Sequence, residues 1–200
     1  PGSNMEAPAL ANNAFALALY AALSAQDGNL ILCPCSLSSS LAAAYAGARG
    51  NTSRQMAKLL HVPRDLSRSL APWTDMMRDL KARGQKDQAK VTFANALWVN
   101  KGQGVLPEFT DIVKSWPNTG IREVDFAANP TAGIKSINLW TEKHTAGKVK
   151  GLVPTGTVES SARLVLTSAA HLSALWSTPF SEDSTGQAPF QTAAGKSVNV

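Results

Sequence analysis

Residues 90–101 read KVTFANALWVNK, and this stretch decides the class of fold. Its side chains alternate as they do along an extended chain, but both faces are largely apolar. One face carries Val91, Phe93, Leu97 and Val99, and the other carries Thr92, Ala94, Ala96 and Trp98. A strand with two apolar faces is typical of the centre of a sheet that is covered on both sides. The stretch therefore predicts a covered, central strand.

The sequence before this strand has the patterns of helices. Helical spacing predicts an amphipathic helix over residues 8–26, and a short apolar strand is expected over residues 29–33. Two further helices are predicted around Met56 and Met77, the second of them basic.

The helix that follows Pro34 is expected to be buried. Ser36 stands where a side chain can cap the N-terminus of a helix. Helical spacing predicts an inward face of Leu37, Leu41, Ala44 and Tyr45. Because this helix is dense in Ala and Ser, it can lie close to other backbone.

The sequence after residues 90–101 alternates between strands and helices. A short helix around Phe109 precedes a strand over residues 120–126. Asn129-Pro130 then opens a helix with a capping residue followed by proline at the first helical position. Residues 163–176 predict a second central strand. Helices first, then strands interleaved with helices, is an α+β arrangement.

The sequence lacks the patterns of common catalytic sites. It contains no G-x-S-x-G, no G-x-x-x-x-G-K-S/T and no H-E-x-x-H, and its three histidines are far apart. An enzyme is therefore disfavoured, and no cofactor is expected. Cys33 and Cys35 are too close for an unstrained disulfide. They could supply two thiolates to a metal, but no third ligand lies near, so buried thiols acting as small hydrophobes are favoured and no metal site is predicted.

Composition and charge indicate which kinds of protein the chain can be. With 44% hydrophobic and 16% charged residues the chain is globular. Its longest apolar stretch, residues 14–23, is about half of what a membrane-spanning helix needs, so no membrane partner is expected. The net charge is +5, and residues 49–90 hold ten Lys or Arg against four Asp. Such a basic segment can bind a polyanion. Alternatively, its charges simply lie on a solvent-exposed helix face.

Short motifs recur in one order along the chain and together resemble the serpin family. They are NLILCPCS at 29–36, LAAAY at 41–45, GARGNT at 47–52, ANALWV at 94–99, LPEF at 106–109, VDF at 124–126, INLW at 137–140, TAGKVK at 145–150 and LW through PF at 175–180. The resemblance implies a serpin fold, incomplete in this chain. Residues 6–200 are then the N-terminal portion of a single serpin domain, with the helical layer and the first strands of the large sheet A. Residues 1–5 are expected to be an expression scar and the N-terminal residue.

The resemblance also implies a function. A serpin is a suicide-substrate inhibitor of a serine or cysteine protease, whose cleaved reactive loop inserts into sheet A. That loop is expected beyond this chain, and the whole protein is expected to be secreted or extracellular. The alternatives are a non-inhibitory serpin serving as carrier or chaperone, and a polyanion-binding module. No nucleic-acid partner is expected.

The resemblance carries two sets of candidate residues. The first controls opening of the sheet: Cys33, Ser36 and Ser168 are expected to meet as a polar cluster beneath the sheet, and Trp176 matches the family's tryptophan at the top of the sheet. This chain departs from the pattern, because Cys33 replaces a serine and Ser168 replaces an asparagine. The second set surrounds the helix that binds heparin-like chains in some serpins: Arg68, Arg78, Lys81, Arg83 and Lys86.

Overall fold

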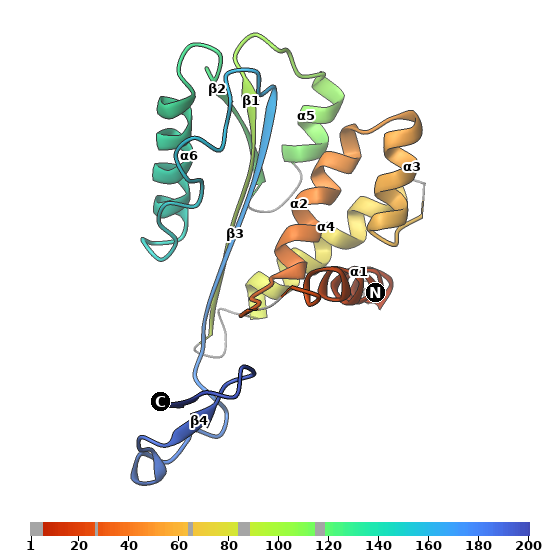
Figure 1. Cartoon of the computed structure of the whole chain (residues 1–200). Helices are drawn as coiled ribbons and strands as arrows, with labels where there is room; N and C mark the ends of the chain where they lie inside the picture. The colour runs from red at the N-terminus through yellow and green to blue at the C-terminus, as the bar shows by residue number, and fades with distance from the viewer. Residues whose placement is uncertain (1–5, 27, 64–65, 84–88, 115–118) are drawn as a thin grey trace.

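The computed structural model describes residues 6–26, 28–63, 66–83, 89–114 and 119–200. The expected scar at residues 1–5 and the candidate Lys86 lie outside the described residues, and the side chain of Arg68 is also not described. A three-stranded sheet separates two layers of helix (Figure 1). The α+β class predicted from the sequence is confirmed.

One layer is made of the first five helices (Figure 1). Their bounds are α1 Glu6–Leu23, α2 Pro34–Gly47, α3 Gly50–Leu59, α4 Leu66–Arg83 and α5 Pro107–Lys114. Each of them is at a position where helical spacing predicts a helix. No helix in the described part of the chain is both long enough and apolar enough to cross a bilayer.

The sheet has the order β2-β1-β3, so β1 is its central strand, as predicted for residues 90–101. The strands are β1 Lys90–Asn100, β2 Thr119–Val124 and β3 Leu164–Ser173. Strand β1 pairs in parallel with β2 and antiparallel with β3. The expected second central strand, β3, is instead at the edge of this sheet, because β1 is its only partner among the described residues.

Helix α6, Pro130–His144, forms the layer on the other face of the sheet among the described residues (Figure 1). It begins as predicted: the Asn129 side chain accepts a hydrogen bond from the backbone N–H of Ala132 at 2.9 Å, and Pro130 follows. After it, a short 3-10 helix (Glu182–Ser184) and a small hairpin of β4 (Pro189–Gln191) and β5 (Ser197–Asn199) end the chain.

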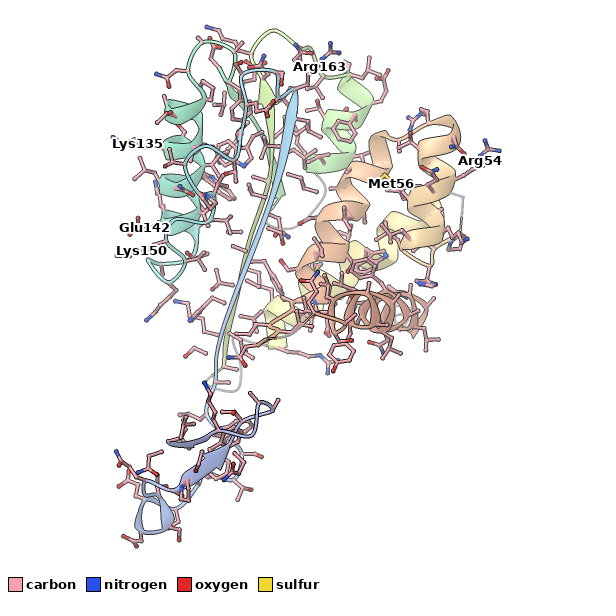
Figure 2. The ribbon with its side chains drawn as sticks, in the orientation of Figure 1. Arg54, Met56, Lys135, Glu142, Lys150 and Arg163 are labelled. Atoms are coloured by element: carbon pink, nitrogen blue, oxygen red, sulfur yellow. The ribbon has the colours of Figure 1, made fainter. Side chains whose placement is uncertain are left out.

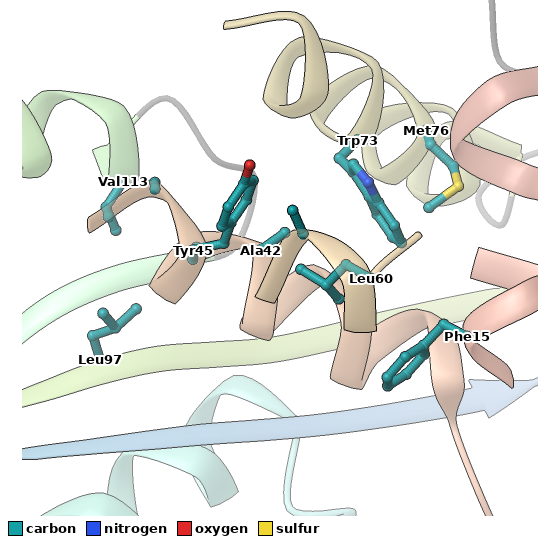
Figure 3. Packing of buried hydrophobic residues seen from close by; sticks show 11 residues of the cluster. Phe15, Ala42, Tyr45, Leu60, Trp73, Met76, Leu97 and Val113 are labelled. Atoms are coloured by element: carbon teal, nitrogen blue, oxygen red, sulfur yellow. The ribbon is translucent and has the colours of Figure 1, made fainter. Parts of the chain in front are cut away.

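Two apolar clusters hold the layers together. The first cluster lies among the helices α1 to α5 and reaches the sheet at Leu97. Figure 3 shows its buried side chains in close view: Phe15, Tyr45, Leu60, Trp73, Leu97 and Val113. Between the sheet and α6 lie Ala96, Trp98, Phe126 and Ile137. Neighbouring residues of β1 thus enter opposite cores, which explains why both of its faces are apolar.

Three local predictions before β1 are wrong. Residues 29–33 form no strand, because no described segment pairs with them, and Ile31 is 94% exposed. Cys33, not Ser36, is the N-cap residue of α2. The predicted inward face of α2 is wrong in part: Tyr45 is buried as expected, but Leu37 is exposed. Most of the buried positions carry small side chains that let the helix approach the sheet: Ser36, Ser38, Ser39, Ser40, Ala42, Ala43 and Ala46.

Candidate functional site

A buried chain of hydrogen bonds joins α2 to the sheet. The Ser36 Oγ lies 2.6 Å from the Ser168 Oγ of β3 and 3.3 Å from the Asn95 Oδ1 of β1. The Asn95 Nδ2 lies 3.3 Å from the Ser39 Oγ, and that hydroxyl donates to the Ser36 carbonyl oxygen at 2.9 Å. We call Ser36, Ser39, Asn95 and Ser168 the polar cluster.

The direction of these hydrogen bonds follows from the number of protons available. A serine hydroxyl has one proton, and Ser36 uses its own to donate to Asn95. Ser168 must therefore donate to Ser36. Each hydroxyl of the cluster then donates once, and Asn95 both accepts and donates. The amide oxygen and the amide nitrogen of Asn95 therefore both have hydrogen-bond partners within the cluster, as a fully buried side chain requires.

Strand register places the cluster on one face of the sheet. Asn95 and Ser168 are direct partners in the antiparallel β1–β3 ladder, so their side chains lie on the same face. Ser36 and Ser39 stand three residues apart on α2 and therefore project to one side of the helix. The cluster joins α2 to both β1 and β3 within a layer that is largely apolar.

The structure brings together two of the three residues expected in this cluster. Ser36 and Ser168 meet, but the Cys33 side chain is exposed and forms no hydrogen bond with either of them. The prediction for Cys33 is therefore wrong, because its backbone serves as the N-cap and the helix starts one turn before the cluster. Trp176 lies beyond the end of β3, is 72% exposed, and packs edge-to-face on Phe180 with ring centroids 6.0 Å apart. The roles of these residues in sheet opening stay predictions.

Asn95 was not among the residues predicted from the sequence. The sequence did carry a signal for this residue: Asn95 is an amide side chain in the middle of a predicted strand, and the residues on either side of it are apolar. A polar side chain at a core position needs buried partners, and the partners turn out to be serines of α2. The burial of the α2 serines could not be predicted in this way, because serine is common on exposed helix faces.

Cys35 is a partly buried thiol, whereas Cys33 is exposed, so the expected pair of buried thiols is not formed. The Cys35 Sγ lies 3.8 Å from the Met77 Sδ. Burial raises the pKa of the Cys35 thiol to about 11, and the neighbouring Cys33 adds to the rise. The part of the chain that the structure describes holds no group of three or more His, Cys, Asp or Glu side chains placed to bind a metal.

The raised pKa predicts how the rate of alkylation of Cys35 depends on pH. The neutral thiol is the form stabilised by folding, so the stabilisation is complete below the pKa of an unfolded cysteine, about 9, and is lost as the pH rises through about 11. In a Cys33→Ser variant, alkylation of Cys35 by iodoacetamide should stay slow at pH 8 and accelerate steeply toward pH 11. Rapid alkylation at pH 8 in the folded protein would contradict the burial of this thiol.

The expected polyanion residues on α4 do not form a free basic patch. The Arg78 Nη1 lies 3.2 Å from the Asp75 Oδ1, and the Arg83 Nε lies 2.6 Å from the Asp79 Oδ2. Lys81 is exposed but also has an interaction partner. Because two of its arginines are paired with aspartates, α4 offers fewer unpaired cations than its number of Lys and Arg suggests.

Comparison with known proteins assigns the family. The family model described as serpin (serine protease inhibitor) matches residues 10–200. The chain belongs to the serpin family. A leukocyte elastase inhibitor of Sus scrofa is 33% identical over 94% of this chain and 49% of its own length. An uncharacterized serpin-like protein of Thermococcus kodakarensis is 33% identical over 92% of this chain and 42% of its own length. This serpin chain thus spans about half the length of the curated relatives it matches.

Solved serpin structures show the same fold over the same half. The native stressed conformation of Arabidopsis AtSerpin1 superposes with a TM-score of 0.86 at 23% identity, covering 100% of this chain and 51% of that one. Human thyroxine-binding globulin gives 0.86 at 25% identity, covering 99% of this chain and 53% of its own. The serpin fold predicted from the ordered motifs is confirmed.

Proposed function

We propose that the protein is a suicide-substrate inhibitor of a serine or cysteine protease. In this proposal the nucleophile of the protease attacks the scissile carbonyl of a reactive loop beyond the described residues. An acyl bond to the protease forms as the peptide C–N bond breaks and the new amine takes a proton. The cleaved loop then inserts into the sheet beside β3 before water can hydrolyse the acyl bond.

The free edge of β3 is the observation that carries this proposal. Strand β3 runs over ten residues and pairs with β1 along one edge, while its other edge has no strand partner among the described residues. Unpaired backbone donors and acceptors along such an edge accept an additional strand. The identity to leukocyte elastase inhibitors supports the same function.

The polar cluster gives this chain a restraint on insertion. Ser168 belongs to β3, the strand that must move when a new strand enters, and its hydroxyl is held by Ser36 of α2. Asn95 holds β1 to the same helix. We propose that the cluster keeps β1 and β3 in place on α2 until the loop is cleaved.

The proposal is tested by incubating the full-length protein with a panel of serine and cysteine proteases. We expect a band on SDS gels that resists boiling, because the acyl bond survives denaturation. Its mass should be that of the protease plus the inhibitor chain up to the cleaved bond, since the piece after the cut is released. A protease whose nucleophile has been blocked chemically is the control and should give no such band. Cleavage of the loop without any covalent band would exclude the inhibitory function and leave the carrier or chaperone function.

Heparin binding by α4 also remains a proposal. Protease nexin-1, whose structure was solved with heparin, has the same fold with a TM-score of 0.83 at 24% identity. That likeness concerns the fold alone, and Arg78 and Arg83 of α4 are paired with aspartates.

A further inference from the structure

The cations of the helical layer differ in whether they have partners. Arg78 and Arg83 of α4 are paired with aspartates, and Arg49 donates to two backbone carbonyl oxygens at 3.0 and 2.9 Å. Arg54 and Lys58 of α3, in contrast, make no hydrogen bond or ion pair with any residue that the structure describes. Figure 2 shows Arg54 pointing away from the helical layer into solvent.

These two unpartnered cations line one hollow of the surface. The hollow has a volume of about 550 Å³, and its lining comes from one face of α3 and the turn that follows: Asn51, Arg54, Gln55, Ala57, Lys58 and Val62. Helix α3 contains no Asp or Glu, so no carboxylate of that helix competes for the cations. The hollow therefore combines two positive charges with two amide side chains over a small apolar floor.

The spacing of these groups sets the kind of ligand. Arg54 and Lys58 stand one helical turn apart, which places their Cβ atoms about 5–6 Å from each other. Two anionic groups on neighbouring atoms of one ring match that spacing, and a guanidinium binds sulfate or phosphate oxygens through two parallel hydrogen bonds. Asn51 and Gln55 can donate further hydrogen bonds to the same oxygens.

We propose that the α3 hollow binds a compact polyanion, a small ring compound that carries several sulfate or phosphate esters. The site is on α3 and is separate from the α4 residues expected from the family resemblance. It does not depend on protease inhibition, because none of its residues belongs to the polar cluster or to the sheet.

The test uses the full-length protein and two probes, sucrose octasulfate and inositol hexakisphosphate, titrated by calorimetry at low ionic strength. We expect saturable binding of at least one probe, and affinity that falls as salt is added. Tighter binding of one probe identifies the ester that the site prefers. The double variant Arg54→Gln/Lys58→Gln should weaken binding by about tenfold or more, since each lost cation removes a charge-assisted contact. Arg54→Lys, which keeps the charge but loses the paired hydrogen bonds of the guanidinium, should weaken binding less than the double variant does.

The matched control is Arg78→Gln/Arg83→Gln, which removes the same charge from α4. It should change the affinity by less than about twofold, because those arginines are already neutralised. Thermal unfolding of both double variants verifies that they are folded, and glutamine suits an exposed helix position. Equal losses in the two double variants, or no saturable binding of either probe at millimolar concentration, would overturn the proposal.

Discussion

Replacing Asn95 with Ala should lower the free energy of unfolding by roughly 2–3 kcal/mol. Asn95 is 0% exposed and both accepts from Ser36 and donates to Ser39. Alanine would leave the Ser39 hydroxyl without its donor and deprive Ser36 of its acceptor, inside a layer that water does not reach. We expect the full-length variant also to polymerise faster on mild heating, because β1 would no longer be held to α2.

The matched control for this variant is Asn13→Ala. Asn13 is an exposed residue of α1, so its replacement removes the same atoms without disturbing a buried network. Urea titration of the two variants against the parent protein measures the difference directly. If Asn95→Ala costs no more than Asn13→Ala, the polar cluster contributes nothing to stability and the restraint we propose is wrong.

Replacing Gly133 with Val should lower the free energy of unfolding by about 3 kcal/mol. A Cβ at this position of α6 would lie 2.7 Å from the Phe126 Cδ1 and 3.0 Å from the Val124 Cγ1. Phe126 is fully buried and cannot turn away, so α6 would have to lift from the sheet. The gain in helix propensity over glycine is smaller than this cost.

Gly120→Val on β2 is the corresponding control. No atom lies within 4 Å of a Cβ built at Gly120, and a β-branched residue suits a strand. We expect this variant to be as stable as the parent protein or slightly more stable. Hydrogen exchange in α6 should become faster only in Gly133→Val, and unchanged exchange there would show that α6 tolerates the added side chain.

The parts of the fold predicted correctly are those where local chemistry decides the structure. Strand β1 is apolar on two faces and α6 begins with Asn129-Pro130, and either signal can be recognised without knowing the partner. The paired arginines of α4 were also predictable, because Asp75 and Asp79 stand three and four residues before Arg78 and Arg83.

The parts that were missed depend on tertiary contacts. Serine and alanine give α2 little contrast between its faces, so hydrophobic spacing selected Leu37 as an inward residue although it is exposed. Which residues of α2 face inward depends on the close approach of the helix to β1 and β3. Asn95 and Ser36 are 59 residues apart, and only the folded chain shows that they meet. The same holds for residues 29–33, whose apolar sequence predicts a strand but cannot supply its partner.

Thermal unfolding of the full-length protein before and after cleavage of its reactive loop tests the central claim most directly. If the free edge of β3 receives the cleaved loop, the new backbone hydrogen bonds and buried side chains should raise the unfolding temperature by more than about 10 °C, since each additional kcal/mol raises it by a few degrees. The cut chain should then be more stable than the intact one. An unfolding temperature that stays the same or falls after cleavage would contradict insertion beside β3, and with it the inhibitory mechanism.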